Sequence, residues 1–190
     1  MIPVLRVWRL MAVLAVLALP GAVRAQPAGT VALVDFADES SEGRMIGAEA
    51  FTTPTLVHFL SRRRPDLATV AGGPVRTWLQ SRGWAPTGFL STGRAAELGA
   101  ALGATLVVTG RWVTLDLVTM PDEPPAPGQP VRGETLGRAA AEIRVVDVRT
   151  RRVVHEEVLR SQVLGLAGRQ ALLVAAQNVL REAAERLSRL

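Results

Sequence analysis

The stretch AELGAALGATLVVTGRW, residues 96–112, places a helix of small residues directly before an apolar strand. Its helical half is rich in residues with little or no side chain, among them Ala96, Gly99, Ala100 and Gly103. Because each missing side chain removes a spacer, such a helix can approach a sheet closely. Residues 105–117 then form a long run rich in β-branched and apolar residues, which is typical of a strand. Gly110 inside this strand indicates either a bulge or a close backbone approach.

Strands and helices alternate in the first half of the chain, and consecutive strands follow. Strands are expected at residues 30–36, 67–71, 105–117, 139–148 and 153–163, and helices at 54–63, 74–82, 93–103 and 172–190. Thr53 and Thr92 are the expected N-caps of the first and third helix. The order β-α-β-α-α-β-β-β-α predicts an α/β (α+β) protein. We expect a single mixed β-sheet of about five strands with helices packed on it, and a C-terminal amphipathic helix.

Three segments occur in an order that resembles a superfamily of envelope domains: VALVDFADES (31–40), AAELGAALGATLVVTGRW (95–112) and AAEIRVVDVRTRRVV (140–154). The resemblance is to CsgG-type curli-assembly proteins, LpoB-type penicillin-binding-protein activators and the amino-terminal domain of TolB. It covers most of residues 30–190, and it implies a domain that acts through protein contacts. Thr150-Arg151 stands where these families usually have Thr-Gly, and the chain has no cysteine for the lipid of CsgG-type and LpoB-type members.

The amino terminus has the pattern of a secretory signal peptide. Two arginines precede the apolar run Leu10–Leu19, and small residues end at Ala25, so residues 1–25 are expected to be cleaved. An uncleaved anchor is the alternative, although a bilayer span needs about 20 apolar residues. Residues 26–190 then form one domain with a proline-rich loop at 119–133. We expect a periplasmic or secreted protein, with outer-membrane association left open.

Composition excludes several classes of site. Loss of Arg6, Arg9 and Arg24 with the leader would lower the net charge from +5 to +2, which removes the main support for nucleic-acid binding. Without cysteine there are neither disulfides nor thiolate metal sites. His58 and His155 have no ligand spacing around them and are interpreted as structural. We therefore expect no metal and no cofactor.

Two groups of residues are candidate sites. The acidic loop contains Asp38, Glu39 and Glu42 directly after the first strand, close to Asp35. Ligands commonly bind at this end of an α/β sheet, but a solvated loop that caps a helix explains the same residues. The second group consists of candidate partner-contact residues: Trp84, Pro124, Pro125 and Pro127. Arg62–Arg64 could bind an acidic surface, but the run more often complements a helix carboxyl terminus.

The function expected from these observations is that of an exported, non-enzymatic envelope protein. It would act through protein–protein contacts in envelope assembly or maintenance. The alternative is a subunit of an oligomeric, outer-membrane-associated secretion assembly, in which the chain forms a homo-oligomer. The third hypothesis is an enzyme or a small-ligand carrier that uses the acidic loop. It ranks last, because no set of nucleophile, base and orienting group can be assembled from the sequence.

Overall fold

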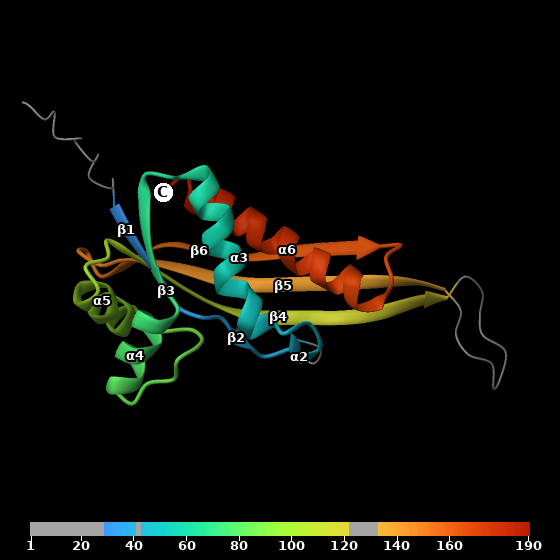
Figure 1. Ribbon diagram of the computed structural model, residues 1–190, viewed down its shortest axis with the longest axis horizontal. Helices are drawn as coiled ribbons and strands as arrows, with labels where there is room; N and C mark the ends of the chain where they lie inside the picture. Colours follow the sequence, from blue (N-terminus) through green and yellow to red (C-terminus); the bar gives the residue numbers. More distant parts are fainter. Residues whose placement is uncertain (1–28, 41–42, 122–132) are drawn as a thin grey trace, which may run out of the picture.

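A computed structural model describes residues 29–40, 43–121 and 133–190 (Figure 1). The elements in chain order are β1 (Gly29–Leu33), β2 (Ala37–Asp38), α2 (Gly43–Ile46), α3 (Ala48–Arg63), β3 (Leu67–Ala71), α4 (Gly73–Ser81), α5 (Thr92–Ala101), β4 (Leu106–Pro121), β5 (Gly133–Asp147), β6 (Arg152–Leu164) and α6 (Gly168–Leu187). No helix among these residues is long and apolar enough to cross a bilayer. The expected leader, 1–25, lies outside the described residues.

One mixed sheet organises the molecule and confirms the expected fold class. Its strands run in the order β3-β1-β4-β5-β6, and the short β2 pairs with β4. β1 is parallel to both of its neighbours, whereas β4, β5 and β6 are antiparallel. From β1 the chain reaches β3 through α3, and it then returns past β1 to β4 through α4 and α5. The strand order therefore reverses around β1, and such a reversal leaves a crevice at the carboxyl end of the strand.

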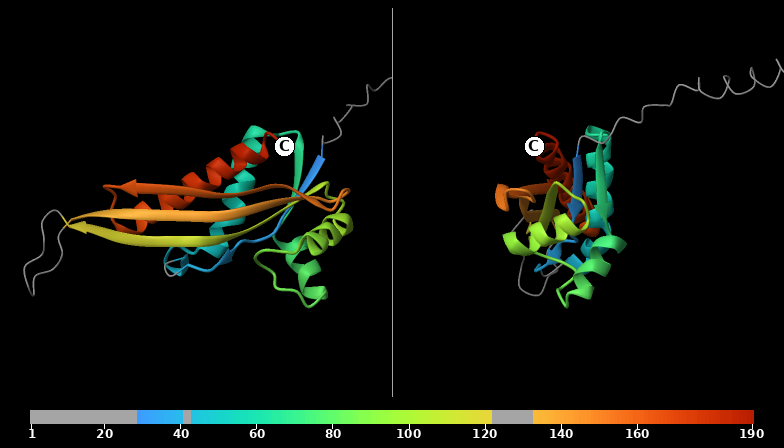
Figure 2. Two further views of the ribbon diagram at one scale, coloured as in Figure 1. Left: turned by 180° about the vertical axis from the view of Figure 1, so that it is seen from behind. Right: turned by 90° about the vertical axis from the view of Figure 1, so that its left-hand side faces the viewer.

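Helices cover the two sides of the sheet unequally. Helices α3 and α6 pack on one side, where Trp112, Leu115 and Leu159 join the main core. Helices α4 and α5 pack on the other side, but only near β1 and β3, around a smaller core that includes Leu79 and Leu98. Figure 2, seen from behind, shows the long strands β4 to β6 extending past α4 and α5 with no helix in front of them. The far half of this side is therefore free of helices within the described chain.

The opening stretch packs largely as its composition predicts. Gly99 faces the sheet, and a Cβ atom added there would lie 2.2 Å from Val148 Cγ2. Ala100 is exposed and Gly103 has φ +66°, so the expectation that these two residues lie in the contact is wrong. Gly103 instead ends the helix in the left-handed conformation. The residue that caps α5 is Ser91, one position before the expected Thr92, and its hydroxyl accepts the Arg94 amide.

Gly110 marks a close approach rather than a bulge. The Phe36 ring lies over it, and a Cβ atom on Gly110 would come within 2.5 Å of Phe36 Cζ. The register shift in β4 occurs a little later, between Trp112 and Thr114. Phe36 is thereby packed against Trp112, with ring centroids 6.3 Å apart.

Helix α3 begins at Ala48, so the start expected at Pro54 is wrong. Thr52 and Thr53 lie inside the helix, and both side chains are buried. The Thr52 hydroxyl donates to the Ala48 carbonyl at 2.6 Å and accepts the Trp112 indole N–H at 2.9 Å. These tertiary contacts hold the first turns in helical form despite the backbone hydrogen bond that Pro54 removes.

The later strands are longer than expected. Pairing of β4 with β5 continues from Leu106–Asp147 to Pro121–Gly133, so both ends of the loop expected at 119–133 are strand. The far parts alternate polar and apolar residues, and this alternation is typical of strands with one side uncovered. Residues 122–132 lie outside the described residues. Helix α6 confirms the expected amphipathic helix, although Leu190 lies beyond its end and is exposed.

Candidate functional site

A buried carboxylate lies at the carboxyl end of β1. The Asp35 side chain is 4% exposed, and it directly follows the buried run Val31–Val34. Its Oδ1 accepts the Thr53 hydroxyl of α3 at 2.6 Å, and its Oδ2 accepts Arg76 Nε of α4 at 2.6 Å. One carboxylate thus joins the strand to a helix on each side of the sheet. The hydrogen bond to Asp35 raises the pKa of Arg76, which keeps that guanidinium charged.

A cavity of about 330 Å³ opens beside Asp35. Its lining comes from α3, α4 and the segment that follows α4: Glu49, Ala50, Arg76, Gln80, Pro86 and Thr87. The last segment is fixed to the strand, because the Gly88 amide donates to the Asp35 carbonyl at 2.8 Å. The cavity therefore occupies the crevice that the opposite connections leave at the end of β1.

The acidic loop does not converge on this cavity. Ser40 donates its amide to Asp38 Oδ1 at 3.0 Å and also bonds it through its hydroxyl, so Asp38 forms a local turn. Glu39 is exposed and pairs with Arg111 at 3.1 Å. Glu42 lies outside the described residues. Within the described chain no three acidic or histidine side chains come together as metal ligands. The loop's ligand role stays a prediction, whereas the neighbouring Asp35 lines a cavity.

A second surface, the helix-free face, is the side of β4–β6 opposite α6. Its side chains form rows across three strands, and each row pairs neighbours directly: Thr109–Arg144–Glu156, Arg111–Glu142–Val158, Thr114–Ala140–Arg160, Asp116–Arg138–Gln162 and Val118–Leu136–Leu164. Opposite charges meet within rows, as in the two hydrogen bonds of Arg138 to Asp116 at 2.9 and 2.6 Å. The ion-paired rows thus lie beside an apolar row, Val118–Leu136–Leu164, which forms the apolar end of this face.

The apolar end is the most exposed apolar part of this face. Leu164 is 53% exposed and Met120 is 50% exposed, and they lie beside the partly buried Val118 and Leu136. A shallow cavity of about 270 Å³ adjoins them, with Asp116, Arg138 and Arg160 around the small Ala140. Arg160 has no carboxylate partner among the described residues.

Trp84 is part of an aromatic cluster beside α4. Its ring is partly buried and meets the Trp78 ring edge-on, with centroids 5.4 Å apart. The Arg94 guanidinium lies 4.7 Å from the centre of the Trp84 ring and covers it. Packing accounts for this geometry, and the partner-contact role of Trp84 stays a prediction. The other candidate partner-contact residues lie outside the described residues: Pro124, Pro125 and Pro127.

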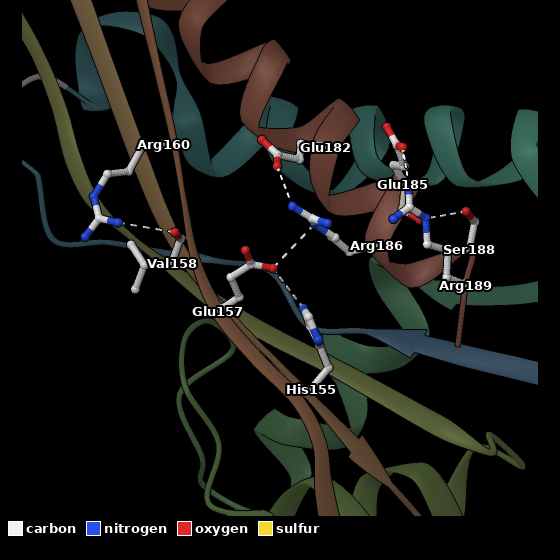
Figure 3. Close-up of polar contacts among 9 residues, drawn as sticks. All are labelled: His155, Glu157, Val158, Arg160, Glu182, Glu185, Arg186, Ser188 and Arg189. Carbon is white, nitrogen blue, oxygen red and sulfur yellow. Dashed lines mark hydrogen bonds and ion pairs between the residues drawn. The ribbon is translucent and has the colours of Figure 1, made fainter.

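His155 belongs to a polar network between β6 and α6. Figure 3 shows His155 beside Glu157, which also faces Arg186 of α6. Arg186 Nη2 in turn donates to Glu182 at 3.1 Å. These contacts tie the edge strand to the helix, which agrees with the structural interpretation of this histidine. His58 is exposed on α3, next to Phe59.

The arginine run at the end of α3 makes intramolecular contacts. Arg64 pairs with Asp66 at 2.9 Å and donates to the Ser188 carbonyl, and Arg63 lies 3.7 Å from Glu185. Two of the three arginines therefore connect α3 to α6 or to the following turn. The run lies at the helix carboxyl terminus, where positive charge is favourable.

No protein-family model matches this sequence, and no curated protein does either. Solved structures are similar in fold. The hypothetical protein CT253 from Chlamydia trachomatis is 16% identical with a TM-score of 0.54, over 84% of this chain and 95% of that one. PelC from Paraburkholderia phytofirmans, solved as a dodecamer, is 16% identical with a TM-score of 0.51, over 84% and 87%. The LpoB C-terminal domain from Salmonella enterica is 11% identical with a TM-score of 0.46, over 71% and 83%.

Likeness at these identities concerns the fold alone. CT253 and PelC share the overall arrangement of sheet and helices with this chain. An LpoB domain is among the similar structures, at a TM-score below 0.5. The CsgG and TolB parts of that resemblance stay predictions.

Proposed function

We propose that the chain is an exported envelope protein without catalytic activity that binds other proteins through its helix-free face. The observation that carries the proposal is the contrast between the two sides of β4–β6. One side is covered by α3 and α6, whereas the other carries ordered ion pairs and an exposed apolar end. Export is supported by the leader-like pattern of residues 1–25. Action in envelope assembly or maintenance rests on the sequence resemblance.

The chemistry of the face favours a particular kind of partner segment. Arg138 and Arg144 are held by carboxylates on neighbouring strands, so little side-chain freedom is lost when a partner docks. Arg160 lacks such a carboxylate within the described chain and lies in the row next to that of Asp116 and Gln162. The exposed Leu164 follows on the same strand. An acidic residue flanked by apolar side chains fits this arrangement.

Affinity capture from envelope extract with matched charge reversals tests the proposal. Arg160→Glu reverses the charge on the helix-free face, whereas Arg62→Glu makes the same change on α3, at the opposite side of the sheet. We expect a discrete captured protein that Arg62→Glu retains and Arg160→Glu loses. Equal capture by both variants, each shown to be folded by circular dichroism, would place the contact elsewhere and contradict the proposal.

A second candidate is a subunit of an oligomeric, outer-membrane-associated secretion assembly. β6 ends the sheet, so within the described chain its outer edge has no strand partner, and Val154 on it is 46% exposed. Such edges can pair with another chain. The dodecameric form of PelC, which shares the fold, adds support by analogy.

Light scattering coupled to size exclusion separates the two candidates. The first candidate predicts a scattering mass of one chain for the purified protein. A discrete mass of many chains, shifted toward one chain by Val154→Lys, would favour the second candidate. Lysine is a suitable probe because charged side chains on an edge strand oppose pairing between chains.

A further inference from the structure

We propose that the cavity beside Asp35 binds a small zwitterion, with a carboxylate and an ammonium group as in an amino acid or a short peptide. The proposal is independent of the helix-free face and goes beyond it. Its basis is the placement of one cation, Arg76, and one exposed carboxylate, Glu49, around a cavity at the end of β1. This crevice between diverging connections is where open α/β sheets bind ligands.

Arg76 is positioned to bind a carboxylate. Its Nε donates to the buried Asp35, which fixes the plane of the guanidinium. The side chain is 53% exposed, and its two terminal nitrogens have no hydrogen-bond partner among the described residues. Those nitrogens form the fork that matches the two oxygens of a carboxylate. Asp35 therefore acts as a positioning residue, since its own oxygens already bond Thr53 and Arg76.

Glu49 supplies the site for an ammonium group. It lies in the first turn of α3, exposed at the cavity wall, and it has no ion pair or hydrogen bond with any side chain that the structure describes, which leaves out those of residues 44 and 45. Among the side chains that the structure describes, the lining carries two negative charges, Asp35 and Glu49, and one positive charge, Arg76. A simple anion such as phosphate would meet net repulsion, and a divalent cation would meet Arg76. A ligand that carries both charges can pair its carboxylate with Arg76 and its ammonium group with Glu49.

The walls set the size of the ligand. Ala50 and Pro86 present small apolar surfaces, and the Gln80 amide adds a polar group. A volume of about 330 Å³ is at the small end of the range for small-molecule sites, about 300–1,000 Å³. The wall formed by residues 86–88 is held in place, because Thr87 forms a β-bridge with Asp35 and the Gly88 amide donates to the Asp35 carbonyl at 2.8 Å. The site is thus formed before a ligand arrives.

Titration of the purified protein with glycylglycine, followed by amide NMR, tests the proposal. N-acetylglycylglycine lacks the ammonium group, and glycylglycinamide lacks the carboxylate. We expect saturable shifts around Arg76 and Glu49 with glycylglycine, and affinities at least about tenfold weaker for both blocked peptides. Equal affinity for the three peptides, or no saturation by glycylglycine at its solubility limit, would overturn the proposal.

Variants assign the two charges to their residues. Arg76→Lys keeps a positive charge beside Asp35 but removes the fork, and we expect affinity for glycylglycine to fall about tenfold. Glu49→Gln should abolish the preference for glycylglycine over its acetylated form. Glu97→Gln, the same change at another exposed glutamate on α5, is the matched control and should leave binding unchanged. Binding that survives both Arg76→Lys and Glu49→Gln would show that the peptide binds elsewhere.

Discussion

Thr52→Val removes one oxygen from the centre of the molecule without changing the shape of the side chain. Thr52 and Trp112 are both fully buried, and the Thr52 oxygen accepts the indole N–H at 2.9 Å. A buried donor without an acceptor costs about 1–3 kcal/mol, and the additional methyl group offsets up to about 0.8 kcal/mol. We therefore expect the free energy of unfolding to fall by about 1–2 kcal/mol. Equilibrium urea unfolding measures this loss, with an unchanged slope.

The same substitution in a Trp112→Phe background isolates the hydrogen bond. Phenylalanine has no N–H to leave unpaired, so Thr52→Val should cost almost nothing in that background. An equal loss in both backgrounds would refute the reasoning, because the cost would then come from packing or from the helix. Such a result would also remove the explanation for why α3 begins before Pro54.

Gly110→Ala should destabilise the protein by about 1–3 kcal/mol in urea unfolding, since its new methyl group would overlap the Phe36 ring. A free energy of unfolding that rises or stays the same would mean that the Phe36 ring moves aside at no cost. Arg151 has φ +53°, so Arg151→Gly should raise stability by about 0.5–1 kcal/mol, and a lower thermal midpoint would contradict this. Asp147 accepts two hydrogen bonds from Thr150, which lower its pKa. A lowered folded-state pKa gives stability that is present above the unfolded-state value and is lost as the pH falls through the folded one. Asp147→Asn should therefore lose less stability on acidification than the wild type, as acid titration of unfolding would measure.

Local patterns were sufficient to predict most elements. The alternation of strands and helices gave the fold class, and β3 begins and ends at the expected residues, Leu67 and Ala71. Gly83 follows the C-cap of α4 and has φ +67°, the left-handed conformation that favours glycine. The families that the sequence resembles usually have glycine at the position of Arg151. Arg151 has φ +53°, a conformation that favours glycine.

The errors concern features that depend on contacts distant in sequence. The Thr53-Pro54 pair has the local signature of a helix start, but the hydrogen bonds of Thr52 with Trp112 and of Thr53 with Asp35 hold both threonines inside the helix. The acidic loop is a local cluster in the sequence, yet the carboxylate beside it that lines a cavity is Asp35, which pairs with Arg76, 41 positions away. A single sequence has no signal for such a pairing. The helix-free face could be anticipated only in the polar alternation of β4 and β5.

The most direct test of the protein-contact account is site-specific photo-crosslinking in living cells. A photoreactive residue replaces Gln162 on the helix-free face or, as the matched control, Gln170 on α6 at the opposite side of the sheet; both glutamines are exposed. We expect a discrete crosslinked protein from position 162, none from position 170, and loss of the product when Arg160→Glu is added. Equal products from both positions, or a product from position 162 that survives Arg160→Glu, would contradict the protein-contact account.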